Sequence, residues 1–132
     1  MEIDHRTAGA AALAYLGDAV IELLVRERLV EDGYASSKAL NAKALGFVRA
    51  GAQAAAMERL LPHLTEEEQA AFRRGRNIGH TNTPKSATVA EYRNATGMEA
   101  LFGYLHIKGE QARIRELFAL AYPQEEKREG KV

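Results

Sequence analysis

Asp18 is the first residue whose surroundings could support chemistry. In a helix, Ala11 and Ala14 lie on the same face as Asp18 and leave room above its carboxylate, and Gly17 precedes it. A glycine inside a helix costs about 1 kcal/mol relative to alanine, so Gly17 is better explained by the close approach of another element. Asp18 could therefore be a ligand, although an ordinary exposed aspartate beside a packing glycine fits the same spacing.

Glu99 has a comparable setting nearer the other end of the chain. It shares a predicted helix face with Thr96 and Gly103, while Met98 and Leu101 point elsewhere and are predicted core residues. Taken alone, Glu99 is more typical of a solvated acid than of a ligand.

The chain offers few other routes to catalysis. It contains no cysteine, which excludes disulfides, thiolate metal sites and thiol catalysis. No Ser-His-Asp order is evident, and the four histidines lack the spacing of zinc ligands. The segment Gly79–Ser86 superficially resembles a nucleotide-binding loop, but Pro84 removes a backbone N–H where phosphate must approach closely, and no strand precedes it. We therefore expect no nucleotide cofactor.

A basic segment lies between the two acids. The whole chain has 18 basic and 18 acidic residues, yet residues 72–94 hold five basic residues and one acid, a net charge of +4. We expect phosphate contact here, although cations in the last turn of a helix also gain about 0.3–1 kcal/mol each from the helix dipole. The candidate RNA-binding residues are Arg73, Arg74, Arg76, Asn77, His80 and Lys85.

Helices must position all of these residues, because Ala and Leu dominate the apolar content while Val, Ile and aromatic residues are sparse. The spacing predicts a first helix over residues 8–29 and a second from Ser36 or Ser37 to about Leu61. Gly46 and Gly51 weaken the second helix and could mark a break or a close helix contact. The apolar stripe predicted for the first helix comprises Leu13, Leu16, Val20, Leu23 and Leu24.

Two capping boxes organise the second half of the chain. Thr65 with Glu68, and Thr88 with Glu91, each match the pattern that begins a helix. Helices are therefore predicted over 66–75, from 89 to about 107 and over 111–121, with a loop over 77–87.

The predicted fold class is all-α, a single bundle of five to seven helices. Residues 1–122 form one domain, and residues 123–132 form a charged tail that we expect to be frayed. No stretch reaches membrane-spanning length and no signal-like apolar run precedes the first helix, so we expect a cytoplasmic protein without membrane association.

Two segments carry a resemblance to a known family. Tyr15–Val20 (YLGDAV) closely resembles the signature helix of the ribonuclease III family, and Tyr92–Gly103 (YRNATGMEALFG) resembles its second metal-binding helix. They occur in the family's order, with a basic loop between them. The chain looks closer still to the Mini-III ribonucleases, the short form that lacks a double-stranded-RNA-binding domain. That likeness includes Arg73–Asn77 and Thr83–Lys85, and it extends from Ala11 to about Tyr122.

The resemblance implies a ribonuclease III-like helical domain and an endoribonuclease that hydrolyses phosphodiester bonds in double-stranded RNA. It implies Mg²⁺ as cofactor, with Asp18 and Glu99 as catalytic residues and metal ligands. It also implies a homodimer and a role in maturing the large-subunit (23S) ribosomal RNA precursor. Ile21 and Val25, apolar but off the predicted stripe, fit either a dimer or a large core.

The sequence departs from the longer family members near the two acids. Those enzymes carry glutamates where this chain has Ala11 and Ala14, and an aspartate where it has Thr96. We therefore expect Mg²⁺ to be held largely through water and RNA phosphate oxygens. Glu22 and Thr96 are second-shell candidates, although Glu22 could instead pair with Arg26 at i+4.

Three other interpretations stay open on the sequence. The first is a catalytically inactive RNA-binding relative of the same fold that acts as a ribosome-associated scaffold. The second is a helical interaction module, which predicts that Asp18 and Glu99 lie far apart. The third is a DNA-binding helix-turn-helix protein.

Overall fold

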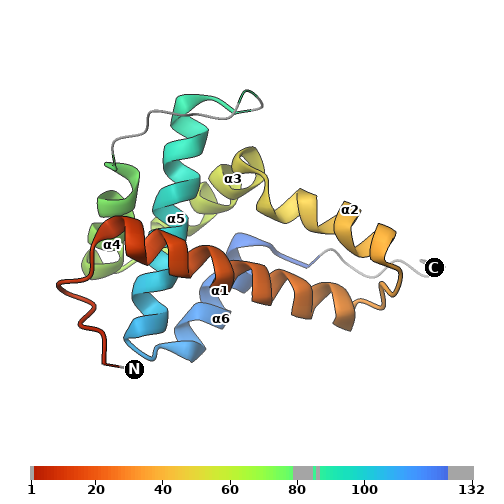
Figure 1. The fold of residues 1–132 in the computed structure, drawn as a ribbon, viewed down its shortest axis with the longest axis horizontal. Helices are drawn as coiled ribbons and strands as arrows, with labels where there is room; N and C mark the ends of the chain where they lie inside the picture. The colour runs from red at the N-terminus through yellow and green to blue at the C-terminus, as the bar shows by residue number, and fades with distance from the viewer. Residues whose placement is uncertain (1, 79–84, 86, 125–132) are drawn as a thin grey trace.

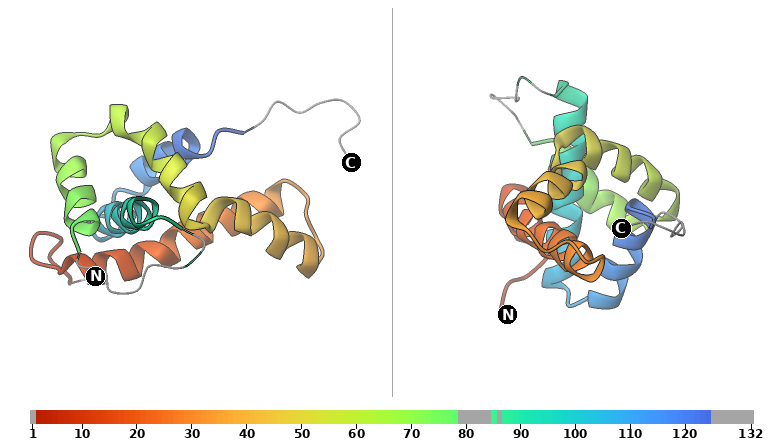
Figure 2. Two further views of the ribbon diagram at one scale, coloured as in Figure 1. Left: turned by 90° about the horizontal axis from the view of Figure 1, so that it is seen from above. Right: turned by 90° about the vertical axis from the view of Figure 1, so that its right-hand side faces the viewer.

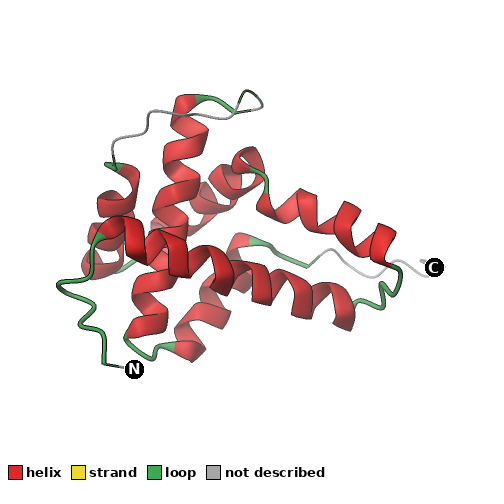
Figure 3. Cartoon of the chain, viewed as in Figure 1, coloured by secondary structure: helices red, strands yellow, loops and turns green. Residues whose placement is uncertain are grey.

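The computed structural model describes residues 2–78, 85 and 87–124. Within this part of the chain the backbone is helical and contains no strand (Figure 3). The elements are α1 (Ala10–Glu31), α2 (Ser37–Val48), α3 (Ala50–Leu60), the 3-10 turn η1 (Leu61–His63), α4 (Glu66–Arg76), α5 (Val89–Ile107) and α6 (Gln111–Ala121). The predicted all-α class is therefore confirmed. None of these helices is long and apolar enough to cross a membrane. His80 and the tail from residue 125 lie outside the described residues.

Helix α5 is the centre of the fold. It crosses α1 steeply in Figure 1, and seen from above it stands nearly end-on with α1, α4 and α3 around it (Figure 2). Met98, Leu101 and Phe102 on this helix are completely buried, as is Leu13 on α1. The predicted core positions on α5 are confirmed, and the core forms where several helices meet this one.

The buried face of α1 differs from the predicted leucine stripe. Leu23 is 60% exposed, whereas Ile21 and Val25 are completely buried. The reason is Gly17, whose face packs against α5 and draws the neighbouring apolar residues inward. Ile21 and Val25 therefore belong to the core of a single chain and give no support to a dimer.

Both predicted capping boxes form. The Thr65 hydroxyl accepts from the Glu68 backbone N–H at 3.2 Å, and the Glu68 carboxylate accepts from the Thr65 N–H at 2.9 Å. Thr88 and Glu91 make the same reciprocal pair at the start of α5. These contacts satisfy donors that a helix leaves open at its first turn, which fixes where α4 and α5 begin.

The predicted second helix is two helices. Its break falls at Arg49, between the two glycines, where the backbone is extended (ψ 146°) and separates α2 from α3. Ser36 caps α2 by accepting from the Ala39 N–H at 3.1 Å. Helix α2 has no buried residue, and Figure 1 shows it beside the far half of α1, away from α5.

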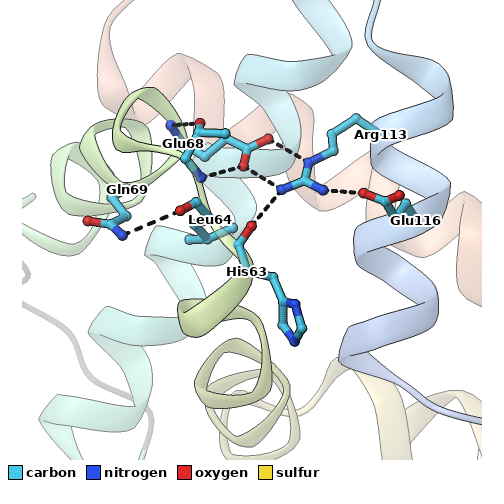
Figure 4. A network of polar contacts seen from close by, with 7 residues as sticks. His63, Leu64, Glu68, Gln69, Arg113 and Glu116 are labelled. Carbon is cyan, nitrogen blue, oxygen red and sulfur yellow. Dashed lines mark hydrogen bonds and ion pairs between the residues drawn. The ribbon is translucent and has the colours of Figure 1, made fainter.

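A polar network ties α6 to the start of α4 (Figure 4). Arg113 donates to both carboxylate oxygens of the buried Glu68, at 2.8 and 2.9 Å, and to the His63 carbonyl at 2.7 Å. The hydrogen bonds from Arg113 lower the pKa of Glu68. The capping residue of α4 is therefore also the anchor for α6.

Candidate active site

At the point of closest approach between α1 and α5, the contact is made by backbone. A Cβ atom on Gly17 would lie 1.6 Å from the Glu99 carbonyl oxygen, and one on Gly103 would lie 2.0 Å from the Leu13 carbonyl oxygen. Only glycine permits this approach at either position. The crossing therefore brings the segments that carry Asp18 and Glu99 together.

The two carboxyl groups face each other at this crossing. Asp18 is exposed, and Glu99 is half-buried beside it. Burial raises the pKa of Glu99 to about 8, and the neighbouring Asp18 carboxylate adds to the shift by repelling the charged form and accepting a hydrogen bond from the protonated one. The interaction-module reading predicted carboxylates far apart, which is not what the structure has.

Small and polar residues surround the pair. Ala14 is buried on α1, and Thr96 is buried one turn before Glu99, where its hydroxyl donates to the Tyr92 carbonyl at 2.9 Å. Among the described residues, no group of three or more His, Cys, Asp or Glu side chains could hold a metal. The site thus offers two carboxyl groups, one of them exposed, which suits a hard cation that keeps several of its waters.

Glu22, one turn beyond Asp18, has a different neighbour. Arg26 donates to its carboxylate at 2.6 Å in an exposed i,i+4 ion pair. The structure therefore contains the ion pair that the sequence offered as the alternative for Glu22.

The basic end of α4 packs directly beside this part of α5. A Cβ atom on Gly75 would lie 2.9 Å from the Thr96 carbonyl oxygen and 2.5 Å from Ala100 Cβ. Arg76 Nε donates to Asn94 Oδ1 at 3.1 Å, and Arg74 donates to the Ala8 carbonyl next to the start of α1. Arg76 is thereby fixed to α5, and Arg74 to the segment that leads into α1.

The remaining basic candidates differ in how far the structure describes them. Arg73, Asn77 and Lys85 are exposed, whereas His80 lies outside the described residues. Asn77 ends α4 as its C-cap. Arg73 lies on the last turn of α4, whereas Asn77 and Lys85 lie between α4 and α5.

A comparison with known protein families covers the two helices that carry the carboxyl groups and the basic segment between them. The Ribonuclease III domain model matches residues 11–110. The chain belongs to the ribonuclease III family. As a member of this family it is an endoribonuclease of the ribonuclease III type.

Within the family, the chain is similar to proteins of about its own length. The chain is 51% identical to a Mini-ribonuclease 3 from Symbiobacterium thermophilum over 83% of this chain and 84% of that protein. It is 41% identical to a Mini-ribonuclease 3 from Enterococcus faecalis, over 86% and 88% respectively. A crystal structure of a protein from Fusobacterium nucleatum shares the fold, with a TM-score of 0.79 and 30% identity over 87% of this chain and 92% of that one.

Two features of this ribonuclease III site were not predicted from the sequence. One is Asn94, whose amide oxygen holds Arg76. The other is the interlocking of Gly75 and Gly97, since a Cβ on Gly97 would lie 2.6 Å from the Phe72 ring. The signal available for the second was the glycine itself, because an interior helix glycine marks a close approach.

Proposed function

We propose that the chain is a Mg²⁺-dependent nuclease for double-stranded RNA, with Asp18 and Glu99 as its catalytic residues and metal ligands. The observation that carries the proposal is the meeting of these two carboxyl groups at the glycine-mediated crossing of α1 and α5. Two adjacent carboxylates repel each other unless a proton or a cation lies between them.

The donor set fits Mg²⁺ better than a softer metal. It consists of oxygen atoms alone, and few of them, so water and RNA phosphate oxygens complete the coordination. When bound, Mg²⁺ supplies an activated water and neutralises charge on the scissile phosphate. Asp18 and Glu99 hold and orient the ion, and Thr96 and Glu22 remain second-shell candidates beside them.

The basic segment is proposed to hold the RNA backbone over the two carboxylates. Arg76 is fixed by Asn94, so its guanidinium needs less ordering when a phosphate binds. Arg73 and Lys85 are exposed and carry no ion pair with a described residue. Arg74, Asn77 and His80 complete the proposed contact set. Duplex RNA is read through its shape, backbone and 2′-hydroxyls, which suits cations gathered at the last turn of α4 and just after it.

An exposed apolar stripe on α1 supports a homodimer. Tyr15 is 86% exposed, Leu23 is 60% exposed, and Ala19 lies between them at helical spacing. Large apolar side chains in a row on an exposed face are typical of a protein–protein contact. Asp18 lies on the same helix, so a second copy docked here brings its own carboxylates close, one site for each strand of a duplex.

We further propose that the natural substrate is a duplex in the large-subunit (23S) ribosomal RNA precursor, cut in the cytoplasm. The likeness to Mini-ribonuclease 3 proteins over most of both chains supports this assignment. The proposed catalytic domain is residues 1–122. The alternative of a catalytically inactive RNA-binding protein is not favoured, because the chain belongs to a family of endoribonucleases.

The test starts from metal-free wild-type protein. It is incubated with duplex RNA, with duplex DNA of the same sequence and with single-stranded RNA, and cleavage is measured before and after Mg²⁺ is added. We expect cuts in duplex RNA only, on addition of Mg²⁺, and their loss in EDTA. Binding of duplex RNA without cleavage under any divalent metal would favour the inactive relative. Equal affinity for the two duplexes would favour a DNA-binding protein.

A further inference from the structure

Helix α2 and its end carry a second group of cations, separate from the basic segment. No acidic residue occurs from Gly33 to Met57, and this stretch contains Lys38, Lys43 and Arg49. All three are exposed, and none forms an ion pair with a described residue. Elsewhere Arg6, Arg26, Lys108, Arg113 and Arg115 are ion-paired.

The fold holds α2 by one side only. Phe47 is half-buried, and its carbonyl accepts from the Tyr122 hydroxyl at 2.8 Å. On the other side Lys38, Ala42 and Arg49 are exposed and follow helical spacing. Lys38 and Arg49 are eleven residues apart, about 16 Å at helical rise. Leu45, which is 45% exposed, lies on this side as well, so the face presents two cations with Ala42 and Leu45 between them.

Gly46, on the same exposed side, has no role in the packing of the chain. A Cβ atom there would meet nothing within 4 Å, whereas one on Gly17, Gly75 or Gly103 would collide with a neighbouring helix. Glycine disfavours a helix relative to alanine, so a glycine here is unexplained by the fold. It does allow another molecule to approach the helix backbone closely.

Only the Arg49 end of α2 lies near the first turn of α5, and the contact there is made by α3. A Cβ atom on Gly51, two residues after Arg49, would lie 3.0 Å from the Glu91 carboxylate. Glu91 is two residues before the exposed Arg93, and the basic segment leads into this end of α5. Arg49 is therefore the cation of α2 nearest to this end of α5.

We propose that the α2 basic face, defined as Lys38, Ala42, Gly46 and Arg49, binds the phosphate backbone of duplex RNA outside the cleavage site. The inference rests on the proposed function, since it takes the same substrate. Exposed cations that form no ion pair suit a regular polyanion that is recognised through its backbone. Such a face lengthens the RNA contact beyond the cleavage site.

The test compares Lys38→Gln/Arg49→Gln with wild-type protein. Fluorescence anisotropy measures the affinity for a blunt RNA duplex in EDTA, so that nothing is cut, over a series of salt concentrations. We expect weaker binding and a plot of log affinity against log salt whose slope is smaller by about two, one for each lost phosphate contact. The matched control is Arg6→Gln/Arg115→Gln, which removes the same charge elsewhere and should leave the slope unchanged.

Gly46→Ala tests whether RNA approaches the α2 backbone closely, without changing any charge. Alanine should raise the melting temperature of the free protein, because it favours the helix and meets no neighbour. The same variant should bind duplex RNA more weakly. An unchanged salt slope in the double variant, with a wild type that binds and cleaves, overturns this inference alone. A wild type that neither binds nor cleaves duplex RNA overturns the proposed function as well.

Discussion

At the scale of single residues, the meeting of Asp18 and Glu99 has a cost in the metal-free protein. Folding places one carboxyl group in a half-buried position beside another, and the pKa of Glu99 rises from 4.5 to about 8. A bound cation offsets this cost, and so does a proton. The same contact therefore explains both the proposed metal affinity and a specific dependence of stability on pH.

The pH dependence can be predicted with its sign. Between about pH 4.5 and 8 the folded chain holds a proton on Glu99 that the unfolded chain has lost. The stability contributed by this proton is present below pH 4.5 and is lost as the pH rises toward 8. Asp18→Asn removes the facing charge, so in EDTA at pH 8 the variant should be more stable than wild type by about 1 kcal/mol.

Thermal unfolding in EDTA between about pH 5 and pH 9 measures this difference. Glu31→Gln, an exposed acid on the same helix, is the control and should follow the wild type. Identical pH profiles for Asp18→Asn and wild type would show that the two carboxyl groups do not interact in solution.

At the scale of elements, backbone contact at Gly17 and Gly103 holds α1 against α5 where they cross. Gly17→Ala should destabilise the protein by about 3 kcal/mol or more, because its Cβ has no room beside the Glu99 carbonyl. Chemical denaturation measures the loss in free energy of unfolding. Gly46→Ala is the matched control, since it adds the same methyl group in open space and should stabilise α2 by about 1 kcal/mol. A tolerated alanine at position 17 would refute the close crossing.

The sequence predicts the ends of helices better than their faces. Thr65 and Thr88 mark the starts of α4 and α5 correctly, because a capping box is a local pattern. The buried face of α1 depends on a distant partner, Gly103, so periodicity alone placed Leu23 inside when it is exposed. No proline marks the helix break at Arg49, and the flanking glycines indicate a break without fixing its position.

In the candidate site, too, local features could be predicted from the sequence, whereas features that depend on distant partners could not. Periodicity left Asp18 and Glu99 as two separate surface acids, because nothing local says which helices cross. The family resemblance predicted their pairing, and Gly17 was the physical sign of it. That Arg76 is held by Asn94 could not be read from the sequence, since it depends on how α4 packs against α5.

At the scale of the whole molecule, the exposed stripe on α1 predicts a dimer. Leu23→Asp should yield a monomer without disturbing the core, since Leu23 is 60% exposed. Sedimentation at matched concentrations measures the change. Val89→Asp, at a comparably exposed apolar residue on α5, should leave the dimer intact. A wild-type protein that sediments as a monomer would contradict the proposed assembly.

The most direct test of the central claim is cleavage of long double-stranded RNA with Mg²⁺ by wild type, Asp18→Asn and the control Glu31→Gln. We expect Asp18→Asn to lose cleavage by at least about a hundredfold, because the proposed ion loses its main ligand, while duplex binding in EDTA is retained. Glu31→Gln should cleave at the wild-type rate. Cleavage by Asp18→Asn at the wild-type rate would contradict the assignment of the active site.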